Sequence, residues 1–185
     1  MKPFSASRAF RRKATVIWLG MHAHGKGAMS TPSAVLKGTP YASGIHLTDG
    51  KTTNPPELIA AAHAGSFSIT LADELGAAGY HPNQIDTTAT VTMEDVAAGW
   101  TMTQIHLDVI ATVPNTPQCD FIDAALRAKT NCPISRLVHA NISMSAKLKP
   151  LRGSSQLSHT LPRPSPRKFQ QTAKNKKNHA TPQRD

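Results

Sequence analysis

One segment of the sequence constrains the fold more than any other, because it carries both the start signal and the stop signal of a long helix. Asn54 is typical of an N-cap, Pro55 suits the first helical position, and Glu57 stands where a capping box is closed. Gly79 is a typical helix end. Between these signals, small or apolar residues recur every three or four positions: Ile59, Ala62, Ser66, Ile69 and Ala72. The pattern predicts a helix over 55–78, roughly 36 Å long, which is the length of a central element.

Segments with the two-residue period of strands lie on both sides of this helix. The expected strands cover 16–19, 27–31, 44–47, 85–93, 101–113 and 142–148. The stretch Ala97 to Gly99 joins two of them into a long hairpin, which Pro114 ends. Further helices are expected over 120–129 and 133–140. The resulting order, β-β-β-α-β-β-α-α-β, is that of an α+β domain.

Charge divides the 185 residues into three parts. The formal net charge of +10 comes from residues 1–13, with five basic and no acidic groups, and from 151–185, with a net charge of +7. Residues 14–150 have a net charge of −2 and form the expected globular domain. The polar, proline-rich 151–185 is expected to be a disordered basic tail. Residues 1–13 are expected to be a basic extension that frays, with a targeting segment as the alternative.

The composition also bears on location and partners. No apolar run reaches the ~18 residues of a membrane span, so no membrane association is expected. Two cysteines are too few for a disulfide framework, which favours a reducing cytoplasm. Charge alone lets the tail bind nucleic acid, but Phe169 is its only aromatic residue, so a solvated extension is favoured over a nucleic-acid partner.

The cysteines differ in their sequence context. Cys132 precedes Pro133 at a helix start, where N–H groups and the helix dipole favour a thiolate; the alternative is a buried, inert cysteine. Cys119 stands before the preceding helix, roughly 15 Å away if that helix spans about ten residues. An intrachain disulfide between the two is therefore not expected.

Histidines supply two weaker hypotheses. His22 and His24 would share a face if their segment were extended, but a metal site needs a further ligand, so a solvated turn is favoured and no metal or cofactor is expected. His63 and Ser66 are one helical turn apart. A Ser–His nucleophile also needs an orienting acid and an oxyanion hole, so a packing serine is favoured.

The central helix carries a family resemblance. The run from Thr53 to Ser68, TNPPELIAAAHAGSFS, resembles the signature helix of the OsmC family, the osmotically inducible protein C branch of the OsmC/Ohr organic hydroperoxide reductases. The segments 85–89 and 131–135 are similar to that family too, and the likeness covers about 13–149. The resemblance implies an OsmC-like α+β fold with its long central helix packed on antiparallel sheets. It also implies an interlocked homodimer with active sites at the interface.

Members of this family are peroxiredoxin-like thiol peroxidases of oxidative and osmotic stress defence. The resemblance implies a peroxidatic cysteine that attacks an organic hydroperoxide, and a resolving cysteine that forms a disulfide with it. An arginine and a glutamate hold the first thiol as thiolate, and a dithiol reductant, such as a lipoylated protein, closes the cycle. Position by position, the resolving cysteine is Cys132 and the peroxidatic position is Ser66. The glutamate position is Pro56 and the arginine position is His46.

A serine hydroxyl cannot be oxidised to a sulfenic acid as a cysteine thiol can, so this chain is expected to be a family member with impaired or absent peroxidase activity. The alternative is a pseudoenzyme, a dimeric module whose pocket binds an apolar, lipid-like small molecule. A nucleic-acid binder that acts through the basic tail ranks last. Peroxide turnover, ligand-induced stabilisation and salt-sensitive DNA retention discriminate among the three.

Overall fold

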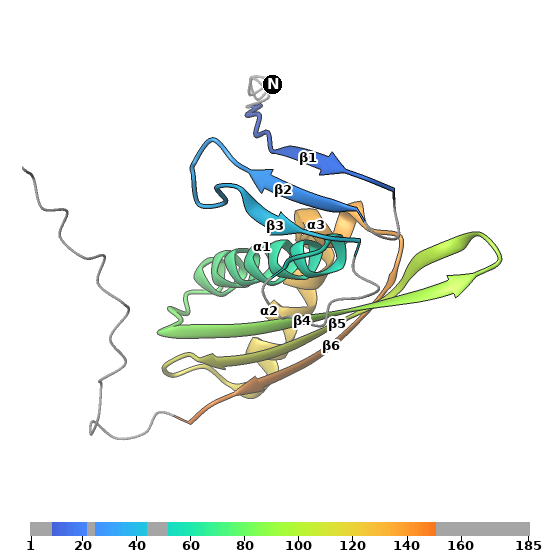
Figure 1. The fold of residues 1–185 in the computed structure, drawn as a ribbon. Helices are drawn as coiled ribbons and strands as arrows, with labels where there is room; N and C mark the ends of the chain where they lie inside the picture. Colours follow the sequence, from blue (N-terminus) through green and yellow to red (C-terminus); the bar gives the residue numbers. More distant parts are fainter. Residues whose placement is uncertain (1–8, 22–24, 44–51, 151–185) are drawn as a thin grey trace, which may run out of the picture. The chain divides into compact units, whose positions relative to one another are not determined.

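The computed structural model describes residues 9–21, 25–43 and 52–150, and Figure 1 shows their elements in the order β1, β2, β3, α1, β4, β5, α2, α3, β6. The expected α+β order is therefore confirmed. One predicted strand, 44–47, lies outside the described residues. The third strand of the structure is instead β3, Thr39–Tyr41, which was not anticipated because Pro40 stands in its middle.

The first three strands form an antiparallel sheet in the order β1-β2-β3, with β1 at Thr15–Leu19 and β2 at Lys26–Ser30. Gly25 lies against the ring of Trp18, and any side chain there would collide with that ring. A parallel bridge between Tyr41 and Thr53 joins this sheet to the residues that begin the central helix. The Thr53 amide donates to the carbonyl of Pro40 over 3.1 Å.

The central helix, α1, spans Pro55–Ala77, one residue short of its predicted end. Asn54 Oδ1 accepts the amide of Glu57 over 2.9 Å, which is the expected N-cap. The Glu57 carboxylate accepts from Thr53 Oγ1 over 3.1 Å. Gly79 adopts φ 85°, a left-handed conformation that glycine reaches without strain, and the helix stops there. Across the described ranges, no helix has the length and apolarity to cross a membrane.

The second sheet has the order β4-β5-β6. Strands β4 (Gln84–Val96) and β5 (Gly99–Thr112) form the predicted hairpin, with a register shift at Thr92/Met93. Strand β6 (Asn141–Leu148) runs parallel to β5, so this sheet is not purely antiparallel as expected. Parallel pairing needs a crossover connection, which the helices α2 (Gln118–Asn131) and α3 (Pro133–Leu137) provide. Helix α3 ends about one turn earlier than predicted.

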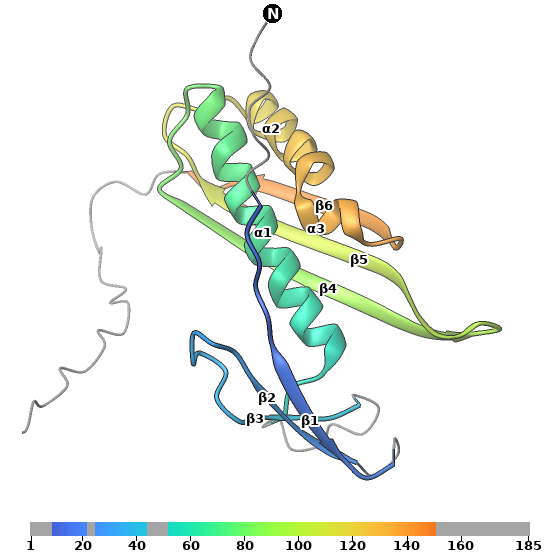
Figure 2. The same cartoon turned by 90° about the horizontal axis from the view of Figure 1, so that it is seen from above.

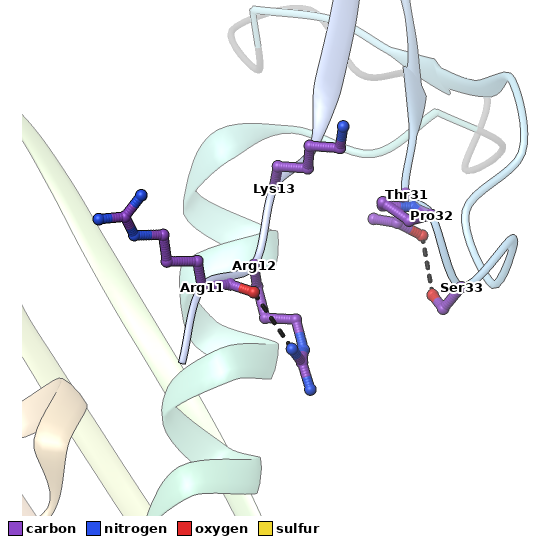
Figure 3. A pocket seen from close by; sticks show the side chains of 6 residues that line it. All are labelled: Arg11, Arg12, Lys13, Thr31, Pro32 and Ser33. Atoms are coloured by element: carbon purple, nitrogen blue, oxygen red, sulfur yellow. Dashed lines mark hydrogen bonds between the residues drawn. The ribbon is translucent and has the colours of Figure 1, made fainter. Parts of the chain in front are cut away.

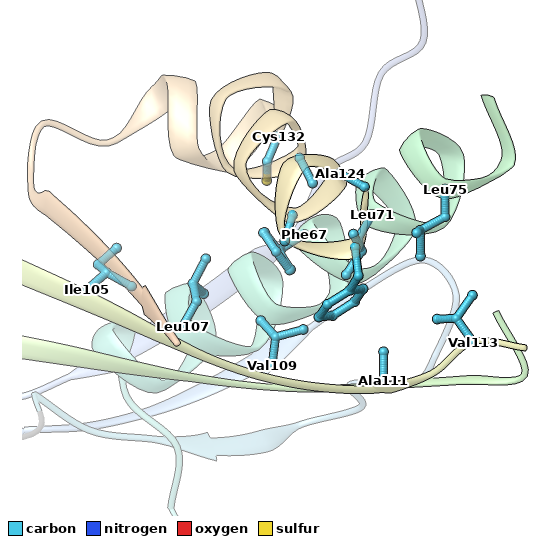
Figure 4. Close-up of a cluster of buried hydrophobic side chains, with 13 residues drawn as sticks. Phe67, Leu71, Leu75, Ile105, Leu107, Val109, Ala111, Val113, Ala124 and Cys132 are labelled. Atoms are coloured by element: carbon cyan, nitrogen blue, oxygen red, sulfur yellow. The ribbon is translucent and has the colours of Figure 1, made fainter. Parts of the chain in front are cut away.

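The hydrophobic core lies between this sheet and the helices, which Figure 2 shows on one face of β4-β5-β6. Alternate residues of β5 point into it, and α1 presents a buried residue at each turn (Figure 4). The fully buried hydrophobic side chains include Phe67, Leu71, Leu75, Ile105, Leu107, Phe121 and Cys132. Burying each large side chain contributes roughly 1.5–3 kcal/mol, so this layer fixes α1 and the α2–α3 junction against one another.

Candidate active site

Cys132 lies where α2 ends and α3 begins. Its backbone is extended, with φ −56° and ψ 123°, because the following Pro133 disfavours the helical conformation for the residue before it. Its amide still donates to the carbonyl of Ala128 over 2.9 Å. The side chain is fully buried and points into the core, as Figure 4 shows. A break between two helices therefore places a thiol inside the molecule.

The junction is tied to α1 by a carboxylate. Glu74 on α1 accepts from Asn131 Nδ2 over 2.8 Å, and Asn131 immediately precedes the cysteine. The same carboxylate pairs with Arg127 Nε on α2 over 2.9 Å. Hydrogen bonds from Asn131 and Arg127 lower the pKa of Glu74, so these contacts hold its ionised form.

The structure brings Ser66 and Cys132 into contact. Ser66 is half-buried on α1, one turn from the buried His63. Its Oγ accepts a hydrogen bond from the Cys132 thiol, with 3.3 Å between oxygen and sulfur. Burial raises the pKa of the Cys132 thiol, but hydrogen bonds from Ser66, from the backbone and side chain of Ser135 and from the backbone of Ile134 outweigh it. The net pKa is lowered, which favours a thiolate.

The disfavoured Ser–His pairing of His63 with Ser66 is not found in the structure. His63 is fully buried, and its Nε2 lies 2.9 Å from Ser135 Oγ rather than at Ser66. Its Nδ1 has no hydrogen-bond partner among the described residues. Burial lowers the pKa of His63, so the ring is neutral near pH 7. No acid of the described ranges orients this ring, so the triad of a serine hydrolase is not formed there.

The other two predicted positions are not brought to the thiol. Pro56 stands at the start of α1, ten residues before Ser66, which is roughly 15 Å along a helix. His46 lies outside the described residues, as do His22 and His24. Of the four predicted positions, the described structure therefore joins Ser66 and Cys132 and separates Pro56 from them.

Ser135 is the site residue that the sequence reasoning missed. It belongs to the quoted segment 131–135 and follows Cys132 by three positions, a spacing that puts both on one side of a helical turn. That three-residue spacing could have indicated from the sequence that Ser135 lies near Cys132. The second thiol, Cys119, is exposed and donates to Asp120 Oδ1 over 3.3 Å, and Asp120 also accepts from the Tyr80 hydroxyl.

An open cleft of about 790 Å³ lies between the N-terminal segment and the loop after β2. Figure 3 shows its lining, which is basic and hydroxyl-bearing: Arg11, Arg12, Lys13, Thr31, Pro32 and Ser33. None of these residues belongs to the thiol cluster. The described part of the chain holds no cluster of three or more His, Cys, Asp or Glu suited to a metal ion.

Comparisons with known proteins agree on one group. A family model described as OsmC-like protein matches residues 48–147. The peroxiredoxin OsmC of Escherichia coli (strain K12) is 41% identical over 138 residues, which cover 75% of this chain and 96% of that protein.

Solved structures give the same picture of the fold. An OsmC-like protein of unknown function from Vibrio cholerae has a TM-score of 0.63 at 12% identity, covering 75% of this chain and 100% of that chain. The organic hydroperoxide resistance protein OhrB of Bacillus subtilis has a TM-score of 0.55 at 20% identity, covering 74% and 98%. A protein described as an organic hydroperoxide resistance protein OsmC from Legionella pneumophila has a TM-score of 0.57 at 19% identity, covering 76% and 98%. At these identities the likeness shows a common fold.

Proposed function

Because the chain belongs to the family of OsmC-like proteins, we propose that it is a thiol-dependent protein of organic hydroperoxide metabolism whose two-cysteine cycle is broken at Ser66. The observation that carries this proposal is the 3.3 Å contact between Ser66 Oγ and the Cys132 sulfur. Two cysteines at these positions would be close enough to form a disulfide with each other.

The substitution removes the first step of that cycle. In a two-thiol peroxidase, a thiolate attacks the peroxide, the O–O bond breaks, the alcohol leaves, and the sulfur is oxidised to a sulfenic acid. A second thiol then displaces water and forms the disulfide, which a dithiol reduces. A hydroxyl at position 66 has no accessible oxidation of this kind. Cys132 is then a resolving thiol without a partner, and turnover of the wild-type chain is poor or absent.

Two further substitutions weaken any thiolate at position 66. An arginine stays charged at all relevant pH values, whereas a histidine with the usual pKa of about 6.5 is mostly neutral at pH 7. His46 in the arginine position therefore stabilises an anion less. Pro56 in the glutamate position offers no carboxylate to orient that partner. Each lost orienting group costs on the order of tenfold in rate.

The protein acts as a homodimer in this proposal. Helix α1 leaves a face of small residues exposed, including Ala61, Ala62 and Gly65, and Ile69 on the same helix is 67% exposed. An apolar helix face of this kind gains stability when a second copy covers it. The proposed setting is the cytoplasm, with a dithiol such as a lipoylated protein as reductant if turnover occurs.

A hydroperoxide consumption assay tests the proposal. Wild-type protein, Ser66→Cys, and the triple variant Ser66→Cys/His46→Arg/Pro56→Glu are compared with cumene hydroperoxide and a dithiol reductant. We expect little turnover from the wild type, partial turnover from the single variant, and at least about tenfold more from the triple variant. Ser66→Cys/Cys132→Ser is the matched control that keeps the new thiol and removes its resolving partner.

Wild-type turnover equal to that of the triple variant would contradict the proposal and assign the chemistry to Cys132 or Cys119 unaided. If no variant turns over, the pseudoenzyme alternative gains support. A rise in melting temperature with an apolar ligand then tests it.

A further inference from the structure

A series of polar side chains, buried at His63 and Cys132 and half-buried at Ser135 and Ser66, lies between α1 and α3. His63 Nε2 lies 2.9 Å from Ser135 Oγ, and hydrogen bonding from the backbone and side chain of Ser135 is among the causes that lower the pKa of the Cys132 thiol. The sulfur also contacts Ser66 Oγ. His63 and Cys132 are fully buried, so water competes little with these bonds.

The direction of the hydrogen bonds follows from the unpartnered nitrogen of His63. A neutral imidazole has one N–H and one lone pair, and its Nδ1 meets no partner among the described residues. An unpaired buried N–H is rarer than an unpaired acceptor, which places the proton on Nε2. Nε2–H then donates to Ser135 Oγ, and the Ser135 hydroxyl is left to donate to the sulfur.

We propose that His63 is a positioning residue for Cys132: by donating to Ser135 Oγ it aims the Ser135 hydroxyl at the sulfur and stabilises the thiolate. The chain thereby keeps one thiolate ready for an electrophile. This assignment concerns the protonation state of Cys132 and does not depend on the proposed function, in which Cys132 is a resolving thiol. His63 stays neutral in this arrangement and acts as a fixed dipole rather than as a base.

Charged groups of the surrounding elements do not supply this stabilisation. On α1, Glu57 is engaged by Thr53, and Glu74 is engaged by Arg127 and Asn131. On the other elements around the cluster, Lys129 donates to the carbonyl of Ile142, and His106 hydrogen-bonds Ser143 and Ser145. Three further charged or titratable residues are exposed: Asp108, Arg136 and His139. The groups that lower the pKa of the Cys132 thiol are Ser66, Ser135 and the backbone of Ile134, and none of them is charged.

The test is a titration of the Cys132 thiolate by its ultraviolet absorbance, which needs no reagent to reach the buried sulfur. Full-length protein carrying Cys119→Ser is used, and the same protein with Cys132→Ser serves as the blank. The variants are His63→Leu, which removes the donor, His63→Gln, which keeps an N–H near the Nε2 position, and Ser135→Ala, which removes the link. Ser68→Ala is the matched control, because that hydroxyl on α1 bonds Ala64 and Thr87 instead of the cluster.

We expect His63→Leu and Ser135→Ala each to lower the thiolate fraction, at a pH below the midpoint, about threefold to tenfold, because a hydrogen bond to a charged group is lost. His63→Gln and Ser68→Ala should titrate like the parent protein. The double variant His63→Leu/Ser135→Ala should match Ser135→Ala alone, since the two residues act in series.

An unchanged titration in folded His63→Leu overturns the inference, and so does a His63→Gln protein as impaired as His63→Leu. If His63→Leu does not fold, His63→Asn replaces it, because that side chain is polar but too short to reach Ser135. No peroxide or reductant is present, so the outcome is independent of turnover. If the titration gives the expected loss of thiolate but none of the proteins in the hydroperoxide assay turns over, only the proposed function is contradicted.

Discussion

The sulfur of Cys132 lies 3.3 Å from the hydroxyl of Ser66, although 66 positions of sequence separate the two residues. The contact exists because α1 carries one residue and the break between α2 and α3 carries the other, and the Glu74 carboxylate holds these elements together. Two cysteines in these positions would be close enough to form a disulfide. In this chain, one of the two is not a thiol.

This contact predicts that Ser66→Cys forms a disulfide with Cys132 under mild oxidation. The two side chains already touch, so the bond requires little rearrangement. The closed loop is long, and the disulfide should stabilise the folded state by about 2–4 kcal/mol. Mass analysis of peptides without reductant detects the link, and unfolding with and without reductant measures the stabilisation.

Ser68→Cys is the control for that experiment, because Ser68 points toward Thr87 and the carbonyl of Ala64. It should form no link with Cys132. Equal cross-linking of the two variants would show that helix motion, rather than the observed contact, brings the thiols together.

The exposed apolar side of α1 predicts an obligate homodimer. Ile69→Lys places a charge on this side and should shift the protein toward monomer or toward unfolding, because a charge buried in the interface lacks a partner. Leu126→Lys is the control, since Leu126 is exposed by 48% on α2. Light scattering at micromolar concentration reads out the mass. A stable folded monomer of the wild type would contradict the dimer.

The sequence predicted the elements whose signals are local. Asn54, Pro55 and Gly79 place both ends of α1 within about one residue, since caps depend on adjacent backbone groups. The hairpin of β4 and β5 was predicted because its alternation is long. Strand β3 was missed because three residues around Pro40 have no period. The direction of β6 was missed because alternation is the same in parallel and antiparallel strands.

The candidate site was predictable only in part for a similar reason. Helical spacing suggested that His63 faces Ser66, three positions away on the same helix. Its observed partner, Ser135, is 72 positions away and is selected by the packing of α3 on α1. Cys132 could be singled out because Pro133 marks a helix start locally. A contact between distant segments has no such local signal.

Removal of residues 151–185 is predicted to leave the domain folded. Among the described residues, the fully buried side chains lie between His63 and Cys132, so truncation after Pro150 removes none of these. The melting temperature should stay within about 2 °C, since a loss of 1 kcal/mol already shifts it by several degrees. Limited proteolysis should yield the same core. A fall of about 10 °C or more on truncation would contradict the proposed domain boundary.

The buried His63 predicts that part of the loss of folding stability at acid pH disappears in the variant His63→Gln. Burial lowers the pKa of His63 below the 6.5 of the unfolded chain, so below that pH the unfolded state binds a proton that the folded state refuses. The stability that the neutral ring contributes is therefore complete above pH 6.5 and is lost as the pH falls through the folded-state pKa.

His63→Gln keeps a donor for Ser135 but does not titrate. We expect urea unfolding of the wild type to lose stability from pH 7 to pH 5 relative to His63→Gln, while His139→Gln, at an exposed position, behaves like the wild type. Parallel pH profiles for the wild type and His63→Gln would show that the folded protein binds this proton as readily as the unfolded chain, and would contradict a lowered pKa of the buried ring.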